Sequence, residues 1–122
     1  MARRYAGIAA LAVLAFCVVF ATGCEDNRVK TNAELGLNDQ QAAGRAIFDH
    51  YCAACHNAYS SRGNKGPGLK DLFKKQYLPS GLPANDNFVR QTIDGGRNMM
   101  PPFGDALTSD QLDALMAYLH TL

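Results

Sequence analysis

The chain of 122 residues lacks a surplus of charge of either sign, with 12 Lys and Arg against 11 Asp and Glu. Because proteins that bind nucleic acid present clustered basic charge, the composition argues against that class. The sequence also lacks internal repeats and the alternation of apolar and polar residues that is typical of strands. We therefore expect an all-α protein, and the chain is short enough to form one small domain.

Long apolar runs are absent apart from one near the N-terminus, from Ala6 to Phe20. Arg3 and Arg4 precede this run, and a basic segment followed by an apolar stretch is typical of an export signal. A helix that spans a bilayer needs about 20 apolar residues, so the run is short for a permanent anchor. We expect residues 1–23 to be a signal peptide.

The expected signal ends in Ala21-Thr22-Gly23-Cys24, which resembles the lipobox of bacterial lipoproteins. This resemblance implies cleavage before Cys24 and attachment of a diacylglyceryl group to its thiol. Residues 24–37 would then contain the lipid-attachment Cys and a polar, flexible tether. The expected location is the periplasmic side of the bacterial cell envelope, anchored to a membrane through the lipid. Ordinary cleavage and retention of the apolar segment as an anchor are the alternatives.

Cysteine and histidine are scarce, with 4 Cys and 3 His in the chain, yet three of them fall within five consecutive residues. In Cys52-Ala53-Ala54-Cys55-His56 the two thiols are about one helical turn apart, so both can form thioether bonds to one haem. His56 is then aimed under the iron as its fifth ligand. The motif predicts one haem c, attached covalently through Cys52 and Cys55.

Two other interpretations of this motif remain open. A redox-active dithiol would follow a strand in a βαβ unit, and no β-branched run precedes Cys52. A tetrahedral zinc site would need a fourth ligand, and the Cys and His residues that remain for it are Cys17, Cys24, His50 and His120.

Polar capping patterns predict two longer helices. Asn38 followed by Gln41 is typical of a capping box at the start of a helix that runs up to the motif. Thr108 followed by Gln111 has the same pattern at the start of a helix near the C-terminus. A shorter helix is expected over Phe88 to Asp94, which two glycines follow.

From about Asn38 to Leu122, the chain resembles the class I c-type cytochromes, which hold one haem. Gly44-x-x-x-Phe48-x-x-x-Cys52 is similar to the N-terminal helix of that family, and Ala117-Tyr118-Leu119 is similar to the C-terminal helix. The resemblance implies that residues 38–122 form a cytochrome c domain in which these two helices cross around one covalently bound haem. It also implies that Gly44 and Phe48 contact Tyr118.

The segment Met99-Met100-Pro101-Pro102-Phe103-Gly104 resembles the Met-Pro-x-Phe loop that supplies the axial methionine in bacterial members of the family. Met100 is the matching residue, and Pro101 favours an extended backbone that keeps the loop from coiling into a helix. Since consecutive loop residues point in different directions, only one of the two methionines is expected to reach iron. The expected metal ligands are therefore His56 and Met100.

Two further residues complete the expected site. Gly66-Pro67 resembles the family's Gly-Pro pair, whose proline carbonyl accepts a hydrogen bond from the proximal histidine and makes it a better ligand. Arg97 is expected to bind a haem propionate, and the sequence leaves Arg90, Tyr77 and Asn98 as alternatives.

These expectations describe a one-electron carrier, not an enzyme, whose partners are redox proteins. No catalytic residue, small-molecule substrate or nucleic acid is part of this expectation. The alternative is an open-iron haem subunit or sensor domain of a larger oxidoreductase, in which Met100 dissociates readily. A basic segment is either a solvated face or a docking surface for an acidic redox partner, and its cations are Arg62, Lys65, Lys70, Lys74 and Lys75.

Overall fold

A computed structural model of the chain describes residues 29–122. The expected signal peptide, Cys24 and the first part of the expected tether lie outside the described residues. The helices of the described residues belong to one compact unit, Thr31–Leu122. In chain order they are α2 (Asp39–Tyr51), the short 3-10 helix η2 (Leu72–Lys74), α3 (Asp86–Gly95) and α4 (Ser109–Leu119).

The expected all-α class is confirmed, because residues 29–122 contain helices and two isolated β-bridges but no strand. The bridges join Tyr77 to Pro83 and Arg97 to Met100. In this described part of the chain, none of the helices combines the length and the apolar character needed to cross a bilayer.

Both predicted capping boxes are present. The side chain of Asn38 accepts a hydrogen bond from the backbone N–H of Gln41 at 2.8 Å, and the Gln41 side chain accepts one from the Asn38 N–H at 3.0 Å. Thr108 and Gln111 make the same reciprocal pair at the start of α4, at 3.2 and 2.9 Å. A side-chain cap of this kind stabilises a helix by about 1 kcal/mol, so short-range polar contacts fix where these helices begin.

Helix α3 begins two residues before the predicted start at Phe88. The reason is Asn85, whose side-chain oxygen accepts a hydrogen bond from the Phe88 N–H at 3.1 Å and caps a helix that starts at Asp86. The helix ends at Gly95, and Gly96 follows with a φ of 66°, a conformation that glycine adopts without strain.

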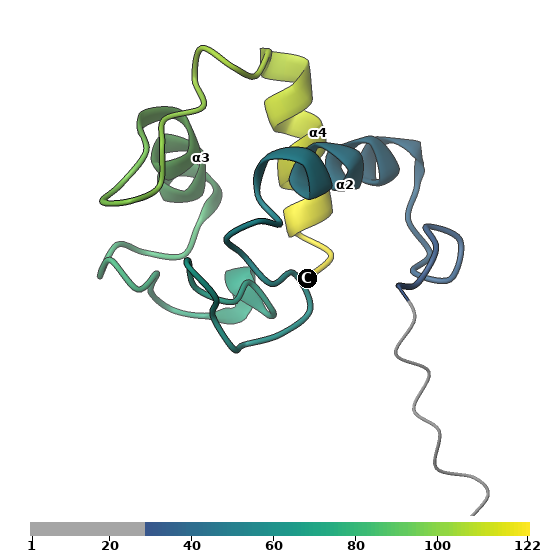
Figure 1. The fold of residues 1–122 in the computed structure, drawn as a ribbon, viewed down its shortest axis with the longest axis horizontal. Coiled ribbons are helices and arrows are strands. Elements are labelled where there is room, and N and C mark those ends of the chain that lie inside the picture. The colour runs from purple at the N-terminus through teal and green to yellow at the C-terminus, as the bar shows by residue number, and fades with distance from the viewer. Residues whose placement is uncertain (1–28) are drawn as a thin grey trace, which may run out of the picture. The chain divides into compact units, whose positions relative to one another are not determined.

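The N-terminal and C-terminal helices cross as expected, and Figure 1 shows α4 running across α2. Gly44 lies at the contact, where a Cβ atom would be 2.5 Å from the carbonyl carbon of Ala114 and 2.9 Å from the Cβ of Tyr118. The ring of Phe48 packs against that of Tyr118, with the centroids 5.5 Å apart. A side chain at Gly44 would therefore force the two helices apart.

Within residues 29–122, the core is built from the apolar faces of α2, α3 and α4 and one residue of η2. Its central members are at most 7% exposed, and Met116 is among them, as its place on the apolar stripe of α4 suggests. The cluster comprises Phe48, Leu72, Val89, Ile93, Leu115, Met116, Tyr118 and Leu119. Burial of side chains of this size contributes about 1.5–3 kcal/mol each, so this cluster is the main source of cohesion.

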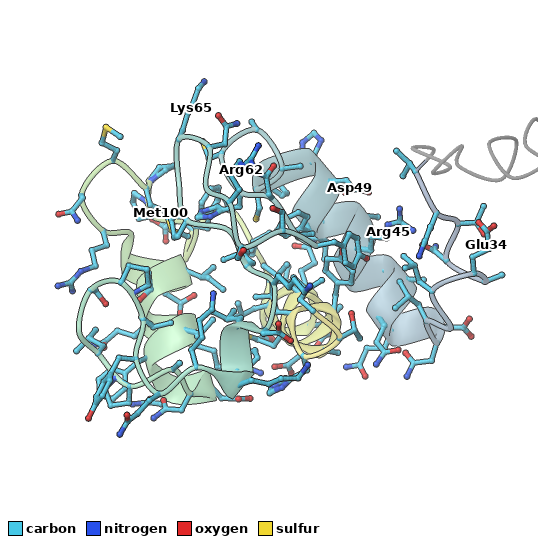
Figure 2. The ribbon with its side chains drawn as sticks, turned by 90° about the horizontal axis from the view of Figure 1, so that it is seen from below. Glu34, Arg45, Asp49, Arg62, Lys65 and Met100 are labelled. Atoms are coloured by element: carbon cyan, nitrogen blue, oxygen red, sulfur yellow. The ribbon has the colours of Figure 1, made fainter. Side chains whose placement is uncertain are left out.

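The folded unit starts at Thr31, before the expected boundary at Asn38. Residues 31–36 form a turn, closed by hydrogen bonds from the backbone and hydroxyl of Thr31 to the carboxylate of Glu34, each 2.8 Å long. The side chain of Asn32 accepts a hydrogen bond from the buried Arg45 of α2 at 2.8 Å. Figure 2 shows Glu34 on this turn beside α2, which carries Arg45 and Asp49. The last part of the expected tether is therefore held against the domain.

We expect Gly44→Ala to destabilise the domain by about 1–3 kcal/mol, because the added methyl overlaps the backbone of Ala114. Helix propensity alone would make the Ala variant more stable by about 1 kcal/mol. A loss of stability in Gly44→Ala would therefore be due to packing. Gly95→Ala is the matched control, since a Cβ there meets nothing within 4 Å. Thermal unfolding of the two variants measures the difference, and equal stabilities would show that the crossing tolerates a side chain.

Candidate functional site

The Cys-x-x-Cys-His segment forms one helical turn at the end of α2. Cys52 is the C-terminal cap of that helix, and its backbone N–H bonds to the carbonyl of Phe48 at 2.8 Å. The Cys52 carbonyl accepts hydrogen bonds from the N–H groups of Cys55 and His56, at 3.0 and 2.9 Å. The backbone thus keeps the two partly buried thiols on a single turn, with the imidazole immediately after it.

The environment of Cys52 does not suit a redox-active dithiol. Both thiols are free, and burial, followed in size by the neighbouring Cys55, raises the pKa of the Cys52 thiol to about 11. Thiol–disulfide exchange needs a thiolate at neutral pH, which requires a lowered pKa. Within residues 29–122, no group of three His, Cys, Asp or Glu side chains is placed to hold a metal ion, so a zinc site lacks its ligands there.

The ring of His56 is fixed by one hydrogen bond and one close backbone contact. Nδ1 lies 2.8 Å from the carbonyl oxygen of Pro67, and because a carbonyl can only accept, Nδ1 is the donor. This leaves the lone pair of Nε2 free for a metal. The ring lies directly over Gly66, where a Cβ atom would be 2.5 Å from the ring carbon Cε1. The contact expected from the Gly66-Pro67 pair is therefore present.

The segment from His56 to Lys70 folds back on itself and on the motif. The N–H of Gly66 bonds to the carbonyl of Cys55 at 2.8 Å, and the N–H of Leu69 bonds to the carbonyl of Asn57 at 2.9 Å. These backbone bonds bring Pro67, eleven positions along the chain, next to the imidazole of His56.

The two adjacent methionines point in different directions. Arg97 and Met100 exchange two backbone hydrogen bonds, of 3.0 and 2.9 Å, that close a tight turn in which Asn98 has a φ of 54°. Met99 at the tip of the turn is 84% exposed, whereas Met100 is partly buried and packs against the core. Of the two thioethers, that of Met100 is therefore the one directed toward the protein.

The loop that carries Met100 is attached to both α3 and α2. The N–H groups of Phe103 and Gly104 bond to the carbonyls of Ile93 and Asp94, at 2.9 and 3.1 Å. The ring of Phe103 also meets that of Tyr51, at the end of α2, edge to face with centroids 5.8 Å apart. This aromatic contact brings the methionine loop beside the helix end from which the motif emerges.

Arg97 is exposed and lines a groove with polar neighbours. The other lining residues are Leu82, Gln91, Thr92, Gly95 and Gly96, on α3 and the segments that flank it. Arg90, an alternative from the sequence, is already engaged in an ion pair with Asp113 at 2.7 Å.

His120 and part of the basic segment are already engaged in contacts within the protein, so they are less available to bind a metal or a partner than their sequence positions suggest. Nε2 of His120 lies 2.9 Å from a carboxylate oxygen of Asp86, and its ring stacks on that of Phe73 with centroids 3.9 Å apart. In the basic segment, Lys74 pairs with Asp71 at 2.6 Å, and this hydrogen bond lowers the pKa of Asp71. Figure 2 shows Lys65 of the same segment pointing away from the ribbon.

Comparison with known proteins identifies the kind of domain to which this site belongs. A family model described as cytochrome C oxidase, cbb3-type, subunit III matches residues 39–119. The cbb3-type cytochrome c oxidase subunit FixP of Sinorhizobium medicae is 34% identical over 88 residues, 66% of this chain and 29% of that protein. Cytochrome c6 of Leptolyngbya boryana is 33% identical over 78 residues, 64% of this chain and 87% of that protein. Quinohemoprotein alcohol dehydrogenase ADH-IIG of Pseudomonas putida is 32% identical over 79 residues, 63% of this chain and 10% of that protein.

The all-α fold of residues 29–122 and these similarities identify a class I, monohaem c-type cytochrome and confirm the resemblance found in the sequence. The chain belongs to the family whose model describes cytochrome C oxidase, cbb3-type, subunit III, since the match covers most of its length. It spans 29% and 26% of the two FixP proteins that it matches.

The Gly66-Pro67 pair is expected from the sequence, but the steric role of Gly66 is visible only in the structure, where its missing side chain makes room for the imidazole. We expect Gly66→Ala to destabilise the domain by about 1–3 kcal/mol, because the new Cβ would displace the His56 ring from Pro67. Thermal unfolding gives the stability, and the ¹⁵N resonance of Nδ1 in His56 reports the hydrogen bond. Lys65→Ala, at an exposed position one residue earlier, serves as the control. An unchanged Nδ1 resonance in Gly66→Ala would contradict this account of the ring position.

Proposed function

We propose that the protein is a one-electron carrier whose single haem c is attached through Cys52 and Cys55 and ligated by His56 and Met100. The observation that carries this proposal is the His56 ring, which donates from Nδ1 to Pro67 and so offers Nε2 as a ligand. When bound, the haem would supply an iron that alternates between the ferric and ferrous states.

The chemistry of the surrounding side chains fits such a group. Several apolar residues that pack against the core remain only partly buried, and they lie on the segments that carry the site: Cys52, Leu69, Met100 and Phe103. An apolar macrocycle has the surface to cover side chains of this kind. The thioether of Met100 is a soft, neutral donor that favours the ferrous state, so two fixed neutral ligands suit a carrier of moderately positive potential.

Arg97 is our choice for a propionate partner. Its guanidinium is exposed beside the polar side chains of Gln91 and Thr92, whereas that of Arg90 is paired with Asp113. A planar guanidinium matches a carboxylate in geometry and charge.

An open-iron subunit of a larger oxidoreductase is the second candidate, and the similarity to part of FixP favours it. The similarity to most of cytochrome c6 favours the carrier. The state of Met100 distinguishes the two, because a bound thioether closes the iron and an absent one leaves a position for external ligands. As a carrier, the protein would need no catalytic residue and no small-molecule substrate, and its partners would be redox proteins.

For the axial ligand, we expect Met100→Ala to lose the far-red sulfur-to-iron absorption band of the ferric protein and to bind cyanide or carbon monoxide promptly. Met99→Ala is the matched control and should keep the band, since Met99 is directed into solvent. Absorption spectra of both variants make the measurement. Loss of the band in Met99→Ala but not in Met100→Ala would show that Met99 is the ligand and contradict our assignment. A wild-type protein without the band would favour the open-iron candidate.

We further propose export to the periplasm and attachment to the membrane by a lipid on Cys24, on the strength of the lipobox-like sequence before that residue. Cys24→Ala should move the haem protein from the membrane fraction to the soluble fraction, and the intact mass should lose the acyl chains. Cys17→Ala removes a thiol from the apolar run and should leave both readouts unchanged. Membrane attachment that survives Cys24→Ala would point instead to retention of the apolar segment.

A further inference from the structure

One hydrogen bond between two tyrosines links α4 to the segment that carries His56. The hydroxyl of Tyr118 donates to that of Tyr59 at 2.8 Å, across 59 positions of the chain. The two rings meet edge to face, with centroids 6.5 Å apart. Neither the haem motif nor the methionine loop includes these residues, so the functional site described above leaves the pair without a role.

The donor is firmly placed by the core. Tyr118 is 1% exposed, and its ring is held against that of Phe48 at the crossing of α2 and α4. A hydroxyl buried this deeply needs a partner, because an unpaired one loses its hydration without compensation. Burial, and then the bond to Tyr59, raise the pKa of Tyr118 above its usual range, so the hydroxyl remains a donor at every physiological pH.

The acceptor, Tyr59, is the exposed member of the pair. Tyr59 is 48% exposed and lies three residues after His56, in a segment without regular secondary structure. Backbone bonds connect its neighbours to the returning limb of that segment, from Leu69 to Asn57 at 2.9 Å and from Lys70 to Ser60 at 3.4 Å. The returning limb also contains Pro67, which holds the imidazole. A displacement of Tyr59 therefore reaches His56 from both sides.

We propose that the Tyr118–Tyr59 hydrogen bond fixes the orientation of the His56 imidazole by anchoring its segment to α4. Both tyrosines are thus positioning residues for the axial histidine, and this inference rests on the proposed role of His56 as an iron ligand. Tyr118 supplies the rigid end of the link and Tyr59 the end that moves with the segment.

The two ends predict unequal effects on stability. Tyr59→Phe leaves the Tyr118 hydroxyl buried without a partner, and we expect the melting temperature of the holoprotein to fall by roughly 4–8 °C. Tyr118→Phe should cost less, since the exposed hydroxyl of Tyr59 can turn to water. The melting temperature of the double variant should rise above that of Tyr59→Phe and approach that of Tyr118→Phe, because the double variant lacks the unpaired Tyr118 hydroxyl. Additive losses in the double variant would overturn the link.

The orientation of the imidazole is tested separately by electron paramagnetic resonance of the ferric holoprotein, because the plane of an axial imidazole determines the principal g values. We expect shifted g values in Tyr118→Phe and Tyr59→Phe and none in the control Val29→Ala, which alters a side chain that is 83% exposed. Unchanged g values in both variants would overturn the positioning role, even if stability falls. A wild-type protein without a low-spin haem signal would instead overturn the proposed function, and this inference with it.

Discussion

The structure depends on the close approach of α2 to α4 at Gly44. Because this residue has no side chain, the backbone of Ala114 can lie where a Cβ would otherwise be, and the two helices lock together. Phe48 and Tyr118 then pack on each other beside the contact and close the core. Burial of these rings stabilises the crossing, and the crossing in turn fixes the end of α2, from which Cys52 and the rest of the motif emerge.

The expected iron ligands lie outside the helices, so their precision depends on how the loops are attached. His56 is oriented by Pro67, and the loop of Met100 is tied to the end of α3 through the N–H groups of Phe103 and Gly104. Each expected ligand thus lies on a segment next to a helix, and a hydrogen bond to a backbone carbonyl holds either its side chain or its loop in place. In the proposed carrier, ligands that keep their positions in both oxidation states would lower the reorganisation energy of electron transfer.

Features set by near neighbours could be predicted from the residues themselves, whereas the distant contacts that were expected, of Phe48 with Tyr118 and of His56 with Pro67, followed only from the resemblance to a known family. The capping box of Asn38 and Gln41 is complete within four residues, and the same holds for the turn of Cys52 to His56. The folded unit starts early because Arg45, on the following helix, donates a hydrogen bond to Asn32. The polar sequence around Asn32 has no hydrophobic periodicity from which this contact could be predicted. The start of α3 at Asp86 is also set locally, because Asn85 is a good helix cap and lies directly before it.

The distinction between a carrier and an open-iron protein rests on how firmly the methionine loop is held. Met100 would have to leave the iron to open it, and the turn that bears Met100 is closed by two backbone hydrogen bonds to Arg97. Pro101 restricts the backbone on the other side, and the Phe103 ring rests against Tyr51. Release of the thioether by a rotation of the loop would break several of these contacts together. Because each contact is lost only at a cost, the attachment of the loop supports the proposed carrier, whose iron would be closed, over the open-iron candidate.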